Sequence, residues 1–180
     1  VKQQLRYKSL FEGNYTAPNA PERMNGPDDL DGVNRLFYSR GWTDGLPIIP
    51  PTPARYEKML SGTNFDENQL LSLIEPRQGK ATVGKVAINA VMSGCLPEHL
   101  PVLVAVANAL GNSDLNLKAL NTTTHPCAVL AIISGPIVEE IDINSTYNAL
   151  GQGSLANATI GRAVRSILSN IGGGTPGILD

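Results

Sequence analysis

A histidine and a cysteine stand two positions apart in the segment 121–136, which reads NTTTHPCAVLAIISGP. The whole chain has only two histidines and two cysteines. Because a residue before proline is extended, and alternate residues of an extended segment share one side, the His125 and Cys127 side chains are expected to face the same way. An imidazole beside a thiol can accept its proton and create a nucleophile.

His125 is therefore a candidate general acid/base, and Cys127 a candidate thiol nucleophile. The hydroxyls of Thr123 and Thr124 just before them are candidate ligand-binding groups. The alternative is structural, since free cysteine is among the most buried residue types and a histidine at a strand end can simply donate to a carbonyl. The spacing leaves both interpretations open.

Cys95 is a second candidate thiol, in the sequence SGCLPEH between the expected end of one helix and the start of the next. A thiol beside a helix N-terminus feels the positive end of the helix dipole, which favours the thiolate. Glu98 and His99 follow closely in the sequence. The alternative is a small apolar side chain that fills the space between two helices.

Two further segments carry polar groups suited to a site. GWTDG contains the only tryptophan, Trp42, as a candidate ligand-binding residue, and the carboxylate of Asp44 as a candidate catalytic group, since binding residues are common on such loops. GQGSLANATIGR brings glycines to a helix N-terminus, where backbone amides and the helix dipole attract anions. The candidate anion-binding residues there are Gly153, Ser154, Asn157 and Arg162, with Arg165 one turn further on. The alternatives are a structural turn for GWTDG, and for the second segment a helix cap with solvated arginines.

The overall composition excludes some classes of function. A net charge of -2 and 5% aromatic residues argue against nucleic-acid binding. No HxH, HExxH or CxxC spacing is present, so neither a metal nor another cofactor is expected. No apolar run approaches the ~20 residues of a membrane span. Two cysteines outside any disulfide framework are typical of a cytoplasmic protein.

Hydrophobic periodicity predicts helices alternating with strands. CAVLAIIS, at about 127–134, is a continuous apolar run bounded by Pro126 and Gly135, as in a strand covered on both faces. The expected fold is therefore α/β, with a mixed or parallel sheet around this buried central strand. Helices are predicted near 30–40, 53–60, 82–94, 97–110 and 157–171, and shorter extended segments at 46–51 and 70–76.

Residues 1–27 are expected to form an extended N-terminal arm before a single α/β domain at 28–180. The arm carries scattered apolar residues, which predicts that it docks on its own domain or on a neighbouring subunit. The apolar ending GGGTPGILD suggests a surface that another polypeptide covers. Processing of a precursor after Asp180, or a separate gene, would equally explain such an ending.

Three long segments resemble the UGSC-type family of bacterial proteins, some of which carry selenocysteine in a UGSC or CGSC motif. They are GWTDGLPIIPPTPARYEKML, GKATVGKVAINAVMSGCLPEHLPVLVAVANAL and SGPIVEEI with NATIGRAVRSILSNIGG, so that the similarity runs from about Gly41 to the end. The motif itself is absent, and no selenothiol role transfers to any position here. The resemblance implies a longer protein or an assembly.

Two functions follow as expectations. The first is a subunit or N-terminal fragment of a bacterial enzyme that acts on a small polar or anionic molecule, thiol-assisted, with an active site shared with a second chain. His125, Asp44 and the turn at 153–157 would then surround one cavity. A lyase, a hydrolase and a thiol-dependent oxidoreductase are not distinguished. The alternative is a non-catalytic partner subunit of a hetero- or homo-oligomer.

Overall fold

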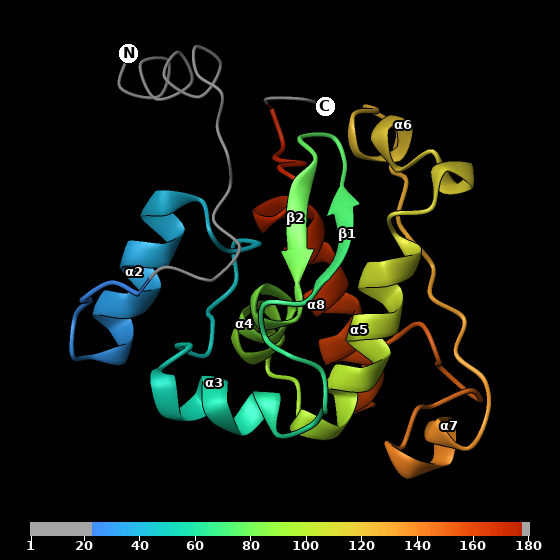
Figure 1. Ribbon diagram of the computed structural model, residues 1–180, viewed down its shortest axis with the longest axis horizontal. Coiled ribbons are helices and arrows are strands. Elements are labelled where there is room, and N and C mark those ends of the chain that lie inside the picture. The colour runs from blue at the N-terminus through green and yellow to red at the C-terminus, as the bar shows by residue number, and fades with distance from the viewer. Residues whose placement is uncertain (1–22, 178–180) are drawn as a thin grey trace.

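The structure is a computed structural model that describes residues 23–177 (Figure 1). Most of the predicted N-terminal arm, and residues 178–180 of the apolar ending, lie outside the described residues. Residues 23–27 are exposed and without regular structure. The first described helix, α2 (Leu30–Arg40), begins where the Asp29 carboxylate accepts a 2.7 Å hydrogen bond from the Gly32 amide, and it ends at Gly41 with a left-handed φ of 68°.

Four of the other predicted helices are present. The helix α3 (Pro53–Leu60) starts with proline in its first turn, and α4 (Val83–Ser93) is capped by the Thr82 hydroxyl and ends at Gly94. A 3₁₀ turn, η1 (Pro97–His99), leads into α5 (Leu100–Ala109), and α8 (Leu155–Asn170) is the longest helix described. The shorter elements were not predicted: η2 (Ser113–Leu115), α6 (Leu117–Asn121) and α7 (Ile137–Glu140).

The described residues contain one small sheet, an antiparallel hairpin of β1 (Leu70–Ile74) and β2 (Gly79–Thr82). Only the first strand was predicted. Gly79 permits a close contact between the hairpin and the end of α8, because a Cβ there would lie 1.8 Å from the carbonyl oxygen of Ile171. The predicted extended segment at 46–51 forms no strand. It is an irregular connection between α2 and α3, and its Ile49 amide donates a hydrogen bond to the Met92 carbonyl oxygen over 3.2 Å.

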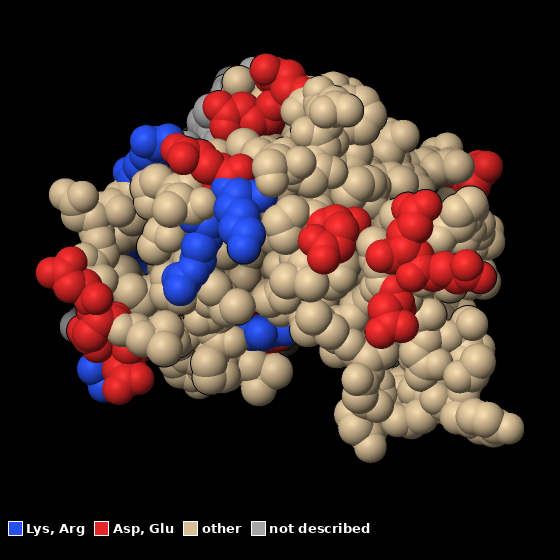
Figure 2. Space-filling view, turned by 90° about the horizontal axis from the view of Figure 1, so that it is seen from below, with Lys and Arg blue, Asp and Glu red and all other residues tan. Residues whose placement is uncertain are grey.

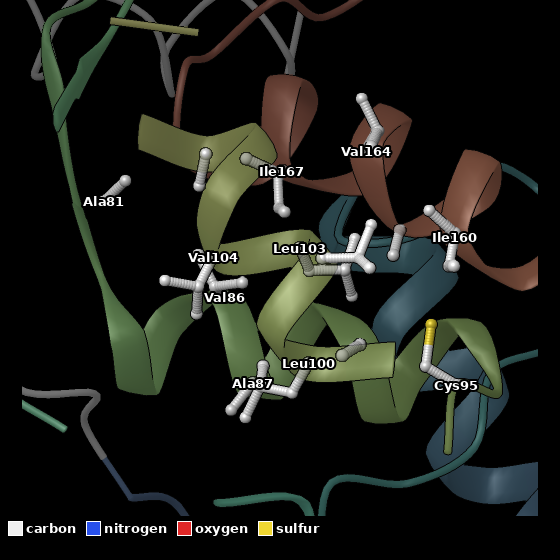
Figure 3. Close-up of a cluster of buried hydrophobic side chains, with 14 of the residues drawn as sticks. Ala81, Val86, Ala87, Cys95, Leu100, Leu103, Val104, Ile160, Val164 and Ile167 are labelled. Atoms are coloured by element: carbon white, nitrogen blue, oxygen red, sulfur yellow. The ribbon is translucent and has the colours of Figure 1, made fainter. Parts of the chain in front are cut away.

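The hydrophobic core lies between α4, α5 and α8, with the hairpin beside them (Figures 1 and 3). Val86, Leu103 and Ile167, one from each helix, are completely buried. Burial of side chains of this size stabilises a fold by about 1.5–3 kcal/mol each. The core therefore depends on helix packing around a small hairpin, and the fold is mixed α/β without a large sheet.

The prediction of a buried central strand at 127–134 is wrong. This run has no regular secondary structure and follows a stretched path between α6 and α7 (Figure 1), and its Leu130 and Ile132 side chains are 68% and 86% exposed. Only its Val129 and Ile133 side chains pack against the core, as partly buried residues. The apolar composition predicted that other parts of the chain bury both faces of this run. In the described part of the chain, only the face with Val129 and Ile133 is packed against other residues. Likewise there is no parallel sheet among residues 23–177.

No helix within residues 23–177 has the length and apolar character that crossing a membrane would require.

Candidate functional site

A cavity of about 430 Å³ opens between the middle of α8 and a wall formed by the end of α6 and the segment that follows it. Asn121, Thr123, His125 and Cys127 supply polar groups from the first wall, and α8 supplies Arg165. His125 and Arg165, which are 40 positions apart in the sequence, thus line the same cavity. The predicted pair, His125 and Cys127, borders the same cavity, together with the predicted Thr123.

Two local hydrogen bonds shape the His125–Cys127 wall. The Thr123 hydroxyl oxygen accepts from the His125 amide at 3.2 Å, and the Cys127 amide donates to the His125 carbonyl oxygen at 2.7 Å. The second bond closes a three-residue turn around Pro126. Both His125 and Cys127 are exposed, so the thiol and the imidazole are open to a reagent or ligand. Thr124 is also exposed but does not border the cavity.

The helix α8 contributes both space and charge to the cavity. Gly161 lines it, and a Cβ at this position would meet nothing within 4 Å. Arg165 lies one helical turn further along, and its guanidinium makes only a 3.5 Å contact with the Gly174 carbonyl oxygen, at the limit for a hydrogen bond. No Asp or Glu of the described residues lines the cavity. Its ionisable groups are a guanidinium, an imidazole and a thiol, which suit an anionic ligand.

Arg162, the arginine predicted to bind the anion, is instead engaged by the GWTDG loop. Its Nε donates to Asp44 Oδ2 at 2.8 Å, one Nη donates to Asp44 Oδ1 at 3.0 Å, and that Nη also reaches the Pro47 carbonyl oxygen at 2.8 Å. The hydrogen bond from Arg162 holds the pKa of Asp44 below its ordinary value, despite opposing desolvation. Neither residue lines the cavity, and the pair fastens the loop to α8.

Trp42 also has a structural environment. Its ring meets the Phe37 ring edge-on at 5.4 Å between centroids, and the Arg40 guanidinium lies 5.3 Å from its centroid. Its carbonyl oxygen accepts from the Asn170 side chain at 3.2 Å. The GWTDG loop therefore joins α2 to α8, and it does not border the cavity.

The glycine-rich start of α8 is occupied by the chain itself. The Ser154 hydroxyl caps the helix by accepting from the Asn157 amide at 3.2 Å. The Asn157 carboxamide accepts from the Asn144 amide at 2.9 Å and donates to the Asn144 and Ala149 carbonyl oxygens at 2.8 Å each. Gly153 provides a left-handed φ of 117°. The predicted anion-binding residues at this helix start thus hold the preceding loop.

Cys95 is a buried core residue, in accordance with the structural alternative. Burial raises the pKa of its thiol to about 11, although a hydrogen bond with Thr159 lowers it. Thr159 also lies 3.4 Å from Nδ1 of the buried His99, and that nitrogen accepts from the Leu96 amide at 3.2 Å. Burial lowers the pKa of His99. A thiol that resists ionisation in a closed site is poorly suited to nucleophilic chemistry.

The structure thus brings together His125, Cys127 and Thr123 and keeps Asp44 and the 153–157 turn out of their cavity. Sequence reasoning gave Arg162 priority over Arg165 and did not identify Gly161. The sequence did carry a signal for both residues. Gly161 and Arg165 are four positions apart, so they lie on the same face of the predicted helix, next to its apolar stripe. Within residues 23–177 no group of three His, Cys, Asp or Glu side chains could hold a metal ion.

Comparisons with protein families, with curated proteins and with solved structures found no match to this chain.

Proposed function

We propose that this chain is a subunit, or an N-terminal part, of an enzyme that acts on a small anionic molecule in the cavity beside Cys127. The observation that carries this proposal is the composition of the cavity. A thiol, an imidazole and a guanidinium border one space of about 430 Å³, and no carboxylate of the described residues borders it. Such a volume accommodates a small metabolite.

Each group has a role in this function. Arg165 binds a carboxylate or phosphate of the substrate through its planar fork of donors. The Cys127 sulfur adds to an electrophilic carbonyl carbon, the carbonyl electron pair moves to its oxygen, and the thiol proton passes to the His125 imidazole. His125 then returns the proton to that oxygen, which completes a reversible addition. The hydroxyl of Thr123 contributes a further hydrogen bond to the ligand.

The resemblance to the UGSC-type family supports a bacterial protein with its site shared with a second polypeptide, and two cysteines outside any disulfide framework support a cytoplasmic location. A non-catalytic partner subunit is the second candidate function. The exposed apolar run at 127–134 favours this candidate, because an interface would cover its Leu130 and Ile132 side chains. The two functions differ in whether the cavity selects an anion.

The test compares two alkylating reagents of similar size and different charge. Iodoacetate is an anion and iodoacetamide is neutral, and both modify thiols. The quantity compared is the rate with iodoacetate divided by the rate with iodoacetamide. We expect this ratio to be several-fold higher for Cys127 than for a free thiol. The Arg165→Gln variant should lose this preference, because the guanidinium that attracts the carboxylate is absent.

Arg162→Gln is the matched control, since it removes the same charge from the next turn of the same helix. It should keep the preference for iodoacetate. Peptide mass spectrometry at successive times gives both rates for Cys127, separately from Cys95. Equal reagent preference in the wild type and in Arg165→Gln would overturn the anion site and leave the partner-subunit function.

A further inference from the structure

The apolar run at 128–134 has the form of a strand without a neighbour. Val129 and Ile133 turn toward the core, and Leu130 and Ile132 turn to solvent at 68% and 86% exposure. Their composition of β-branched and aliphatic residues is typical of strands. Among the described residues, the backbone groups of 128–133 take part in no hydrogen bond with other backbone groups. The run therefore offers open backbone donors and acceptors beside an exposed apolar face.

We propose that two copies of this chain pair through this run as antiparallel strands, with a two-fold axis at Ala131. In this register, Leu130 of each copy faces Ile132 of the other, and Val129 faces Ile133. The larger apolar residues Val129, Leu130, Ile132 and Ile133 thus each meet an apolar residue on their own side of the ladder. A shift of one residue would place outward side chains opposite inward ones. The run is complementary to itself, as an interface between identical copies must be.

The charges at the two ends of the run are complementary as well. The cavity end has His125 and Arg165 and no lining carboxylate, whereas the other end leads into α7 with exposed Glu139 and Glu140. Figure 2 shows one group of acidic side chains without basic neighbours on the side of the molecule where α7 lies, and other acidic side chains beside the basic ones at the left and top. Antiparallel pairing brings the acidic end of each copy to the cavity end of the other. Parallel pairing would place like ends together.

The spacing along the run supports the same arrangement. His125 and Ile137, the first residue of α7, each lie six positions from Ala131. At about 3.4 Å per extended residue, and with turns at Pro126 and at Gly135–Pro136, each lies at most roughly 20 Å from the proposed axis. In this pairing the α7 end of the second copy comes to the His125 end of the first, where a carboxylate can orient the His125 imidazole. This last step rests on the proposed function, and the strand pairing does not.

The first experiment measures the mass in solution by sedimentation equilibrium. The wild-type chain should have twice the mass of a 19.1 kDa monomer. Ile132→Glu should be monomeric and should still unfold in one cooperative transition in urea, because the side chain it replaces is exposed in the single chain. Tyr147→Glu is the matched control at a residue that is 95% exposed outside the run, and it should remain dimeric.

The second experiment tests the register with single cysteines in a Cys127→Ala background, in which Cys95 stays buried. Ala131→Cys should form an interchain disulfide on oxidation, since residue 131 faces itself across the axis. Ser134→Cys alone should not, because it faces Ala128. A mixture of Ser134→Cys with Ala128→Cys should form the mixed disulfide. Non-reducing gel electrophoresis distinguishes these outcomes.

A monomeric wild-type chain, or equal crosslinking at 131 and 134, would overturn the pairing. A dimer that persists in Ile132→Glu would overturn it too, as would binding of only a different polypeptide at the run. These outcomes are separate from the proposed function. A monomer whose Cys127 still prefers iodoacetate retains the anion site, whereas a dimer without that preference retains the pairing alone.

Discussion

Arg162 in α8 and Asp44 in the loop after α2 form a two-point salt bridge across 118 sequence positions, with N–O distances of 2.8 and 3.0 Å. Their side chains are 22% and 21% exposed, and the pair lies at the protein surface. The same guanidinium binds the Pro47 carbonyl oxygen. This contact fixes the connection between α2 and α3 onto the helix that also forms the cavity.

Loss of this bridge should reduce stability and leave the cavity unchanged. We expect Arg162→Gln to lower the free energy of unfolding by about 1 kcal/mol, as for a well-formed ion pair near the surface. Arg165→Gln is the matched control and should have little effect, because its only hydrogen bond in the described structure is at 3.5 Å. Urea denaturation followed by circular dichroism measures both. Equal losses would contradict the separate roles of the two arginines.

The same pair predicts a pH dependence. Because the hydrogen bond from Arg162 depresses the pKa of Asp44 in the folded state, the bridge adds stability above the usual aspartate pKa of about 3.8. This contribution is lost as the pH falls through the lower, folded-state pKa. The difference in unfolding free energy between wild type and Arg162→Gln should therefore shrink between pH 5 and about pH 3. A difference that stays constant over this range would refute the role of the Asp44 charge.

The two cysteines should differ sharply in reactivity. Cys127 is exposed, whereas Cys95 is buried with a pKa raised to about 11. At pH 8, iodoacetamide should modify one thiol in the native protein and both in concentrated urea, and peptide mapping should place the first adduct on Cys127. A Cys127→Ser variant should show no native adduct. Modification of native Cys95 would contradict its place in the core.

Substitutions of Gly161 should affect the stability of α8 and the free space of the cavity in different ways. A Cβ there meets no atom within 4 Å, so Gly161→Ala should stabilise α8 by up to about 1 kcal/mol. Gly161→Leu should fill the cavity and slow iodoacetate modification of Cys127, while the chain stays folded. The measurement is the rate of Cys127 modification by iodoacetate in each variant, and the rate should be lower in Gly161→Leu than in Gly161→Ala. Unchanged alkylation in Gly161→Leu would show that iodoacetate reaches Cys127 without passing through this space.

Asn157 should be essential for the loop before α8. Asn157→Asp keeps the oxygen that accepts from Asn144 but removes the two bonds that the amide nitrogen donates. We expect a loss of about 1–2 kcal/mol and faster limited proteolysis within 142–153. Ala158→Ser, at the next and exposed position, is the control and should cleave like the wild type. Equal cleavage of Asn157→Asp and wild type would contradict the anchoring.

The sequence by itself determined the five longer helices, α2, α3, α4, α5 and α8, because their signals are local. Asp29 and Gly41 mark the ends of α2, and the apolar stripe of Ile160, Val164 and Ile167 marks the buried face of α8. Capping groups and periodicity act within a few residues. The proximity of His125 and Cys127 was predictable for the same reason, since two residues separated by a single proline stay close in any fold, although the structure forms a turn there and not the expected extended segment.

The tertiary structure decided what surrounds these elements. An apolar run predicts an extended conformation and a need for cover, but no local signal says whether the same chain supplies that cover, and at 127–134 it supplies only one face. Likewise, Arg162 and Arg165 have equal local character. Only the packing of the GWTDG loop against α8 commits Arg162 to Asp44 and leaves Arg165 at the cavity, because such contacts join residues more than a hundred positions apart.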